Sequence, residues 1–305
     1  MNDKRGRNTA ASVRDRLLAL ARERGEDFQL LLTQYGLERL LYHLSQSGYR
    51  DRFILKGAML FVLWGNQPHR ATRDVDFLAF GDNSEAALLE IFRELCNVTA
   101  EDDGLTLMAN SVQVNAIRDE TEYGGTRVRL FGDLAGARVP IQADIGFGDA
   151  VTPEAKEIEY PTLLGTEAPR LKAYPRETVV AEKYQALANL GMANSRMKDF
   201  YDLWIIAREF DFDGETLADA IRNTFARRQT PLPRHIPSGL SAEFHKDAQK
   251  NNQWHAFLRK GALAANPPSL TAVCGLLERF LIPPTLAALQ KRKFMAKWEA
   301  GGSWR

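Results

Sequence analysis

Two aspartates separated by one residue, Asp74 and Asp76, have the residue type and spacing that suit a divalent-cation site. Side chains of a strand alternate between its faces, so both carboxylates are expected on one face of a short strand that continues into the apolar segment 77–80. Two neighbouring carboxylates repel each other unless a cation lies between them, and Mg²⁺ prefers carboxylates together with the phosphate oxygens of a nucleotide. The pair therefore predicts Mg²⁺, or Mn²⁺, and a nucleoside triphosphate (NTP), although an isolated Asp-x-Asp is more often a solvated turn.

A small-residue turn upstream, Lys56-Gly57-Ala58, leads into the apolar run 59–64. A glycine turn at the start of a helix offers free backbone N–H groups to a phosphate, so Gly57 and Ala58 are expected to hold the triphosphate. Lys56 could add a charge-assisted contact to a phosphate, or it could be solvated at the end of a strand. Arg73, in the basic loop before the two aspartates, is also predicted to bind the nucleotide.

These segments resemble the first motif of the DNA polymerase β-type nucleotidyltransferase superfamily and, more narrowly, the AbiEii/AbiGii nucleotidyltransferase toxins. Such toxins are the toxin halves of bacterial abortive-infection and toxin–antitoxin pairs. The resemblance extends over most of the chain, through segments in the family's order: 15–21, 30–32, 38–42, 56–58, 73–76, 142–145, 181–187 and 198–204. One position departs from the superfamily pattern, because Ala58 stands where many members have a serine that touches a phosphate. The toxin branch tolerates small residues there, so the backbone cradle remains.

A third carboxylate is expected on a neighbouring strand, either to complete the metal site or to act as the general base for the acceptor hydroxyl. Asp144 fits because a period of two puts it on one face with Gln142, while residues 141, 143 and 145 fill the other face. Asp149 is an alternative, but it follows Gly146 and Gly148 and so is more typical of a turn. A solvated strand-end acid is the structural alternative for Asp144.

Two later segments contain charges on apolar helical patterns. Lys183 lies among the apolar residues of the helical pattern 179–190 and is predicted to bind a phosphate of the NTP, with a salt bridge to Asp199 as the structural alternative. Asp199 and Asp202 are three residues apart and share a helix face, so they are expected to orient Lys183 or the sugar of the nucleotide. Asp199 could equally be an N-terminal helix acid.

The periodicities predict an α+β fold with a small mixed sheet, N-terminal helices and a mainly α-helical C-terminal domain, and the resemblance implies that the sheet belongs to a polymerase β-like nucleotidyltransferase core. Residues 1–48 form the N-terminal helical segment, 49–170 the catalytic core, and 171–305 the helical domain that completes the nucleotide pocket. Leucines at helical spacing predict a helix over 28–45 with Glu38, Arg39 and His43 exposed. The last helical pattern resumes after 231–237 and runs towards Ala300, interrupted at Pro283-Pro284.

The composition, with 45% hydrophobic and 26% charged residues, is that of a globular protein with a sizeable core and excludes a disordered chain. Cys96 and Cys274 lie far apart in apolar segments and are expected to be buried thiols, which suits a cytoplasmic location. No signal sequence and no membrane span are expected. Basic clusters at 222–234 and 291–297 could contact a polyanion despite a net charge of +1, or be solvated helix faces.

The sequence thus predicts a Mg²⁺-dependent enzyme that transfers a nucleoside monophosphate from an NTP to an acceptor hydroxyl. Within the resemblance, the role is that of a toxin neutralised by a cognate antitoxin protein, and the acceptor is RNA, a tRNA 3′ end. One alternative is a nucleotidyltransferase that modifies an antibiotic or a protein. Another is a non-catalytic nucleotide-binding protein that acts by interaction, against which the three carboxylates argue.

Overall fold

The computed structural model of the chain describes residues 2–65, 70–99, 103–117, 125–261, 263 and 265–305. Contacts divide the chain into two compact units. The first comprises Met1–Gly148 and Lys156–Ala173, and the second comprises Asp149–Ala155 and Tyr174–Arg305. A mixed sheet dominates the first unit and helices dominate the second, which confirms the predicted α+β class. The three-part division with boundaries at residues 48 and 170 stays a prediction.

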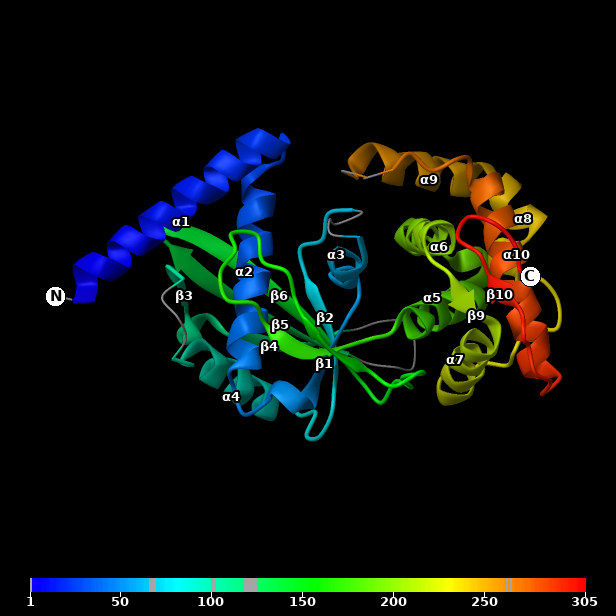
Figure 1. Ribbon diagram of the computed structural model, residues 1–305, viewed down its shortest axis with the longest axis horizontal. Coiled ribbons are helices and arrows are strands. Elements are labelled where there is room, and N and C mark those ends of the chain that lie inside the picture. Colours follow the sequence, from blue (N-terminus) through cyan, green and yellow to red (C-terminus); the bar gives the residue numbers. More distant parts are fainter. Residues whose placement is uncertain (1, 66–69, 100–102, 118–124, 262, 264) are drawn as a thin grey trace. The chain divides into compact units, whose positions relative to one another are not determined.

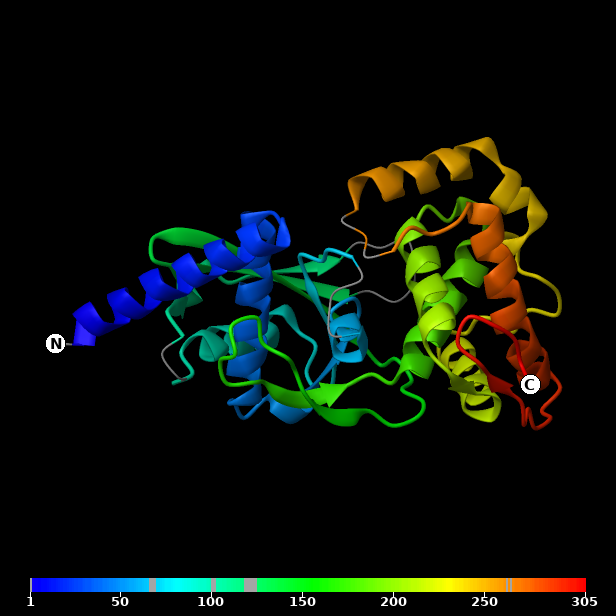
Figure 2. The same ribbon diagram turned by 45° about the horizontal axis from the view of Figure 1, so that its top comes forward.

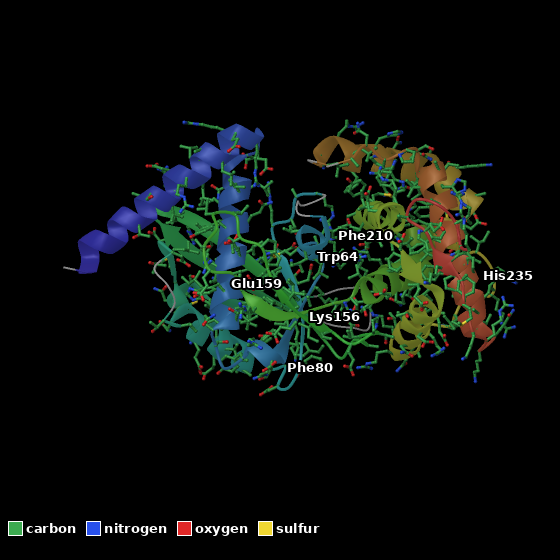
Figure 3. All side chains as sticks on the ribbon, viewed as in Figure 1. Trp64, Phe80, Lys156, Glu159, Phe210 and His235 are labelled. Atoms are coloured by element: carbon green, nitrogen blue, oxygen red, sulfur yellow. The ribbon has the colours of Figure 1, made fainter. Side chains whose placement is uncertain are left out.

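Eight strands form the sheet of the first unit. Seven of them follow the order β3-β5-β6-β2-β1-β8-β7, and the eighth, β4, pairs with β5, as β3 does. Its strands are β1 (Phe53–Lys56), β2 (Val75–Ala79), β3 (Leu105–Leu107), β4 (Gln113–Ile117), β5 (Gly125–Leu134), β6 (Ala137–Phe147), β7 (Lys156–Glu159) and β8 (Arg170–Ala173). Lys156 and Glu159 mark the two ends of β7, and Phe80, which is 47% exposed, follows the end of β2 (Figure 3).

The two longest strands, β5 and β6, alternate between buried and accessible residues along most of their lengths. On β6, Ile141, Ala143 and Ile145 are buried, whereas Gln142 and Asp144 between them are partly exposed. The predicted alternation around Asp144 is therefore confirmed. One face of these strands forms the core and the other carries polar side chains, as expected for a sheet covered on one side.

Four α-helices accompany the sheet: α1 (Asn2–Arg24), α2 (Phe28–Ser45), α3 (Leu60–Gly65) and α4 (Glu85–Cys96). Helix α2 crosses the strands of the sheet (Figure 1). A Cβ atom at Gly36 would lie 2.7 Å from Cγ1 of Val139, so glycine lets this helix approach β6 closely. Asp27 and Ser84 cap α2 and α4 by accepting hydrogen bonds from backbone N–H groups of the first turn.

The prediction that Glu38, Arg39 and His43 are exposed is wrong, because all three side chains are buried. Arg39 Nε donates to Asp103 Oδ2 at 2.6 Å, and Glu38 Oε2 accepts from the backbone N–H of Leu163 at 2.7 Å. His43 Nδ1 lies 2.8 Å from a backbone carbonyl oxygen of α4. Partners distant in sequence satisfy most of these buried polar atoms, whereas Nη2 of Arg39 has no hydrogen-bond partner among the described residues.

The second unit is built from the helices α5 (Arg176–Leu190), α6 (Met197–Glu209), α7 (Gly214–Arg227), α8 (Ala242–Lys246), α9 (Ala248–Lys260) and α10 (Leu270–Leu289). Helix α7 packs against α5 and α10, and α10 also packs against α6 (Figure 2). A short antiparallel pair joins β9 (Phe212–Asp213) to β10 (Lys297–Trp298). The helical pattern predicted over 179–190 is confirmed by α5.

The predicted interruption at Pro283-Pro284 is wrong, because α10 continues through both prolines and ends at Leu289. A proline inside a helix removes the N–H that would bond to the carbonyl four residues earlier, here Phe280 for Pro284. The indole Nε1 of Trp304 donates to that carbonyl oxygen at 3.1 Å instead. The chain beyond α10 also differs from the prediction, since it forms β10 rather than a helix towards Ala300.

Helix α10 is long and apolar enough to cross a membrane, whereas no membrane span was predicted from the sequence. Its apolar window is 56% buried, and it packs against α6 and α7 as a core helix of the second unit. Cys274 on this helix is buried, as predicted, whereas Cys96 is only half-buried. Both cysteines are free thiols.

Candidate active site

Four charged residues occupy one row across neighbouring strands of the first unit. Asp76 on β2 is the register partner of Lys56 on β1 and of Asp144 on β6, and Asp144 is the partner of Arg127 on β5. Register partners share a face of the sheet and have Cβ atoms about 5 Å apart. Folding therefore brings together Lys56, Asp76 and Asp144, which were predicted separately from three segments of the sequence.

The turn after β1 lies directly against Asp76. Gly57 has φ +78°, and a Cβ atom built on it would lie 1.9 Å from Oδ2 of Asp76. Only glycine can provide both this backbone conformation and this approach. Ala58 and Met59 follow the turn with buried side chains, and α3 begins at Leu60.

Asp74 precedes β2, and its side chain is partly exposed like that of Asp76, while Val75 between them is fully buried. The hydroxyl of Thr72 donates to Oδ1 of Asp74 at 2.7 Å. This hydrogen bond fixes the orientation of a carboxylate at the entry of the strand. Arg73, the residue between Thr72 and Asp74, is exposed.

Arg127 clamps Asp144 through both carboxylate oxygens. Its Nε donates to Oδ1 at 2.8 Å and its Nη2 donates to Oδ2 at 2.6 Å, with the Asp144 side chain 17% exposed. This bidentate pair stabilises the ionised carboxylate and leaves a second lone pair on each oxygen. Arg127 was not predicted to be a site residue, although the alternation of residues 126–130 puts its side chain on the accessible face.

The donor types fit a hard divalent cation, because the carboxylates of the register partners Asp76 and Asp144 share a face of the sheet and Gly57 leaves space for the Asp76 side chain. Among the described residues, however, no group of three or more His, Cys, Asp or Glu side chains is already arranged to hold a metal. Asp144 is engaged by Arg127 in this structure. Asp74, Asp76 and Asp144 thus remain predicted metal ligands rather than a preformed cage.

In the second unit, Lys183 on α5 joins the two aspartates of α6. Its Nζ lies 2.7 Å from Oδ1 of Asp199 and 2.7 Å from Oδ2 of Asp202. Both aspartate side chains are almost fully buried, and Arg196 Nε donates to Asp199 at 2.7 Å. Burial alone would raise the pKa of Asp199, but the charges of Lys183 and Arg196 hold that pKa below its usual value.

The salt bridge weighed as an alternative for Lys183 is therefore present, and both aspartates orient its amine. The phosphate-binding role of Lys183 stays a prediction. Asp149, the alternative third carboxylate, belongs to the second unit and accepts from Arg228 Nε at 3.0 Å.

A cavity of about 110 Å³ lies beside the glycine turn in the first unit. It is lined by Glu38 of α2, by Ala58 and Met59, by Thr72, and by Tyr160. Burial raises the pKa of Glu38 to about 7, although the N–H of Leu163 and the charge of Arg39 lower it. Sequence reasoning missed Glu38 because its partners lie far away along the chain.

Comparisons with known proteins show the family of this chain and its fold. A family model described as "Nucleotidyl transferase AbiEii toxin, Type IV TA system" matches residues 39–279. The crystal structure of a candidate nucleotidyltransferase from H. pylori is similar with a TM-score of 0.52 at 14% identity, over 88% of this chain and 100% of that one. JHP933 from Helicobacter pylori has a TM-score of 0.50 at 15% identity, over 87% and 95% of the two chains. At such identities the two structures show the fold alone, and no curated protein matches the chain.

Proposed function

The chain belongs to the AbiEii nucleotidyltransferase toxin family of type IV toxin–antitoxin systems, and from this premise we propose that it transfers a nucleoside monophosphate from an NTP to the 3′ hydroxyl of a tRNA with Mg²⁺. The observation that carries this proposal is the register that sets Asp76 beside Asp144, with the Gly57 turn against Asp76. Membership of the family also implies a protein antitoxin as partner.

Asp74 and Asp76 would hold the cation, and Asp144 would complete the site or accept a proton. When bound, Mg²⁺ or Mn²⁺ would neutralise charge on the triphosphate and stabilise the attacking and leaving oxygens of an in-line displacement. The Gly57-Ala58 turn would support the triphosphate through backbone N–H groups, with Lys56 in the same charged row. These assignments are supported by geometry within the first unit.

In the transfer, the acceptor oxygen forms a bond to the α-phosphorus while the bond to the bridging oxygen of the β-phosphate breaks, so that pyrophosphate leaves. The proton of the acceptor hydroxyl goes to a base. Asp144 would take that proton on one of its carboxylate oxygens, since the hydrogen bonds from Arg127 leave a lone pair on each oxygen. Arg127 would thereby position the base rather than touch the reacting atoms.

An RNA acceptor is favoured over an antibiotic by the charges next to Asp144. Arg129 lies on β5 two residues from Arg127 and thus on the same face. Arg127 is paired with Asp144, whereas Arg129 is exposed and donates to the neutral Gln142. Positive charge beside the acceptor position attracts a polyanion and repels a cationic aminoglycoside. Because tRNA and NTPs are cytoplasmic, we also propose a cytoplasmic location.

A thermal-shift titration tests whether nucleotide binding depends on the metal. A ligand that binds only the folded state raises the unfolding temperature, so each NTP should stabilise the protein more with Mg²⁺ than with EDTA. The Asp76→Asn variant should lose this difference. Equal shifts in Mg²⁺ and in EDTA for the unsubstituted protein would contradict a metal site at Asp74 and Asp76.

A further inference from the structure

A second hollow lies in the first unit where β6 extends beyond β2. The register of the two strands begins at Val75 with Ala143, so residues 137–142 run past the start of β2. A cavity of about 310 Å³ opens there, between the first turns of α2 and the strands β5 and β6. Its lining includes Thr33, Arg73, Arg129, Phe131, Pro140 and Gln142.

This hollow lies next to the charged row of the active site. Arg129 and Gln142 are register partners, and they lie two residues along their strands from Arg127 and Asp144. Two strand residues span about 7 Å, so this row is one step away from the proposed base on the same face. Arg73, which also lines the hollow, immediately precedes Asp74.

The lining has the chemistry of a site for a phosphodiester and a base. Arg129 and Arg73 are exposed, and none of the described residues that line the hollow is acidic. Arg129 Nε donates to Oε1 of Gln142 at 3.1 Å, which orients the guanidinium and leaves its other N–H groups for an anion. The guanidinium of Arg138 lies over the Phe131 ring, 3.4 Å from its centroid, and Pro140 adds apolar surface against which a base can pack.

We propose that this hollow binds the last phosphodiester and the adjoining base of a single-stranded RNA end, so that the terminal hydroxyl reaches Asp144. The inference rests on the proposed function, since it assigns the acceptor's binding site for that reaction. Arg129 forms the charge contact with the phosphate, and Gln142 holds Arg129 in place. An arginine fork matches a phosphate in two hydrogen bonds, which a lysine cannot reproduce.

Fluorescence anisotropy with a labelled, short single-stranded RNA that has a free 3′ hydroxyl, in the absence of NTP, tests the site. The variants are Arg129→Gln, Arg129→Lys and the control Arg170→Gln. Arg170 lies on β8 of the same sheet and is exposed in a surface pair with Glu159 at 3.3 Å. Removal of a surface pair of this kind changes stability little.

Arg129→Gln should weaken RNA binding about tenfold and reduce the dependence of the binding constant on salt by about one charge. Arg129→Lys should keep the salt dependence while losing part of the affinity, and Arg170→Gln should match the unsubstituted protein. The Mg²⁺-dependent thermal shift with NTP should be unchanged in all three. Circular dichroism would confirm equal folding.

RNA binding by Arg129→Gln with unchanged affinity and salt dependence would overturn the inference. The inference would also be overturned if the unsubstituted protein showed the Mg²⁺-dependent NTP shift but did not bind RNA. That result would still be consistent with nucleotidyl transfer to another acceptor. Conversely, RNA binding through Arg129 without any NTP shift supports the RNA site and counts against the proposed function. The two failures are therefore distinguishable.

Discussion

Gly57 and Asp76 are in such close contact that the turn after β1 has no space for a side chain. A Cβ atom at Gly57 would lie 1.9 Å from Oδ2, 2.6 Å from Cγ and 2.8 Å from Cβ of Asp76. The φ of +78° also disfavours any residue with a Cβ atom. The position of the Asp76 carboxylate therefore depends on glycine at this site.

Substitution Gly57→Ala should displace Asp76, lower the free energy of unfolding by about 2 to 5 kcal/mol, and abolish the Mg²⁺-dependent NTP shift. Gly136→Ala is a matched control, because Gly136 has φ +79° with nothing within 4 Å of the added Cβ. It should cost only about 1 to 2 kcal/mol of backbone strain and keep the NTP shift. Equal effects of both substitutions on NTP binding would mean that strain, not contact with Asp76, determines the outcome.

Glu38 predicts a specific pH dependence of stability. Burial raises its pKa in the folded protein to about 7, from 4.5 in the unfolded chain. The folded state thus holds the proton more tightly, so the associated stability is complete below about pH 4.5 and is lost as pH rises through about 7. The loss is on the order of 3 kcal/mol.

Urea unfolding of the unsubstituted protein and of Glu38→Gln at several pH values measures this contribution. Glutamine can still accept from Leu163 N–H but does not ionise. The difference in unfolding free energy between the two proteins should shift in favour of Glu38→Gln as pH rises from 4.5 to 8. A difference that stays constant with pH would show that Glu38 keeps an ordinary pKa.

Individual residues also mark where sequence reasoning stops. The faces of Gln142 and Asp144 were predictable because strand alternation is local. Burial of Glu38 and Arg39 was not, since their partners Leu163, Asp103 and Thr166 are far apart in the chain. The pairing of Arg127 with Asp144 depends on the register of β5 with β6, which no local pattern encodes.

Among the helices, α5 and α6 are held together by one buried cation and two buried anions. Lys183 on α5 is 13% exposed, and the side chains of Asp199 and Asp202 on α6 are 1% and 0% exposed. Removal of one partner from such a group leaves charge buried without compensation. The helical motif predicted to bind the nucleotide therefore also stabilises the second unit.

The substitution Lys183→Met should lower the free energy of unfolding by about 3 to 5 kcal/mol at pH 7. Because the pKa of Asp199 is lowered in the folded state, its stabilising effect is present above its unfolded pKa and is lost as pH falls through the folded pKa. The gap between Lys183→Met and the unsubstituted protein should narrow on acidification. Lys198→Met, at an exposed lysine of α6, is the control and should change stability by less than about 0.5 kcal/mol. Similar losses of unfolding free energy in Lys183→Met and Lys198→Met would contradict the structural role of Lys183.

Helix α10 shows how tertiary contacts override a local rule. Two prolines in succession predicted a break, and the rule that proline removes a backbone donor is correct. The carbonyl of Phe280, which loses its partner to Pro284, accepts from Trp304 instead. Trp304 also stacks on Phe280 with ring centroids 6.1 Å apart. A residue in the last segment of the chain thus allows the helix to continue.

For the molecule as a whole, the α+β class and the family were predictable because several motifs occur in order along the chain, and the family model matches residues 39–279. The assembly of the carboxylates was only partly predictable. Spacing put Asp74 and Asp76 together, but the adjacency of Asp76 to Asp144 follows from a parallel pairing of β2 with β6. Parallel pairing joins segments that are distant in sequence, and its register is not visible in either strand alone.

Transfer of label from NTP to RNA tests the central claim most directly. The purified protein is incubated with Mg²⁺, total bacterial RNA and each NTP labelled at the α-phosphate, and the products are separated on a denaturing gel. We expect one or more NTPs to label tRNA-sized RNA with the unsubstituted protein, and no labelling with EDTA or with folded Asp76→Asn, which lacks one of the charges proposed to bind the metal. Labelling by Asp76→Asn as strong as that by the unsubstituted protein, or no labelled RNA with any NTP, would contradict metal-dependent nucleotidyl transfer to RNA.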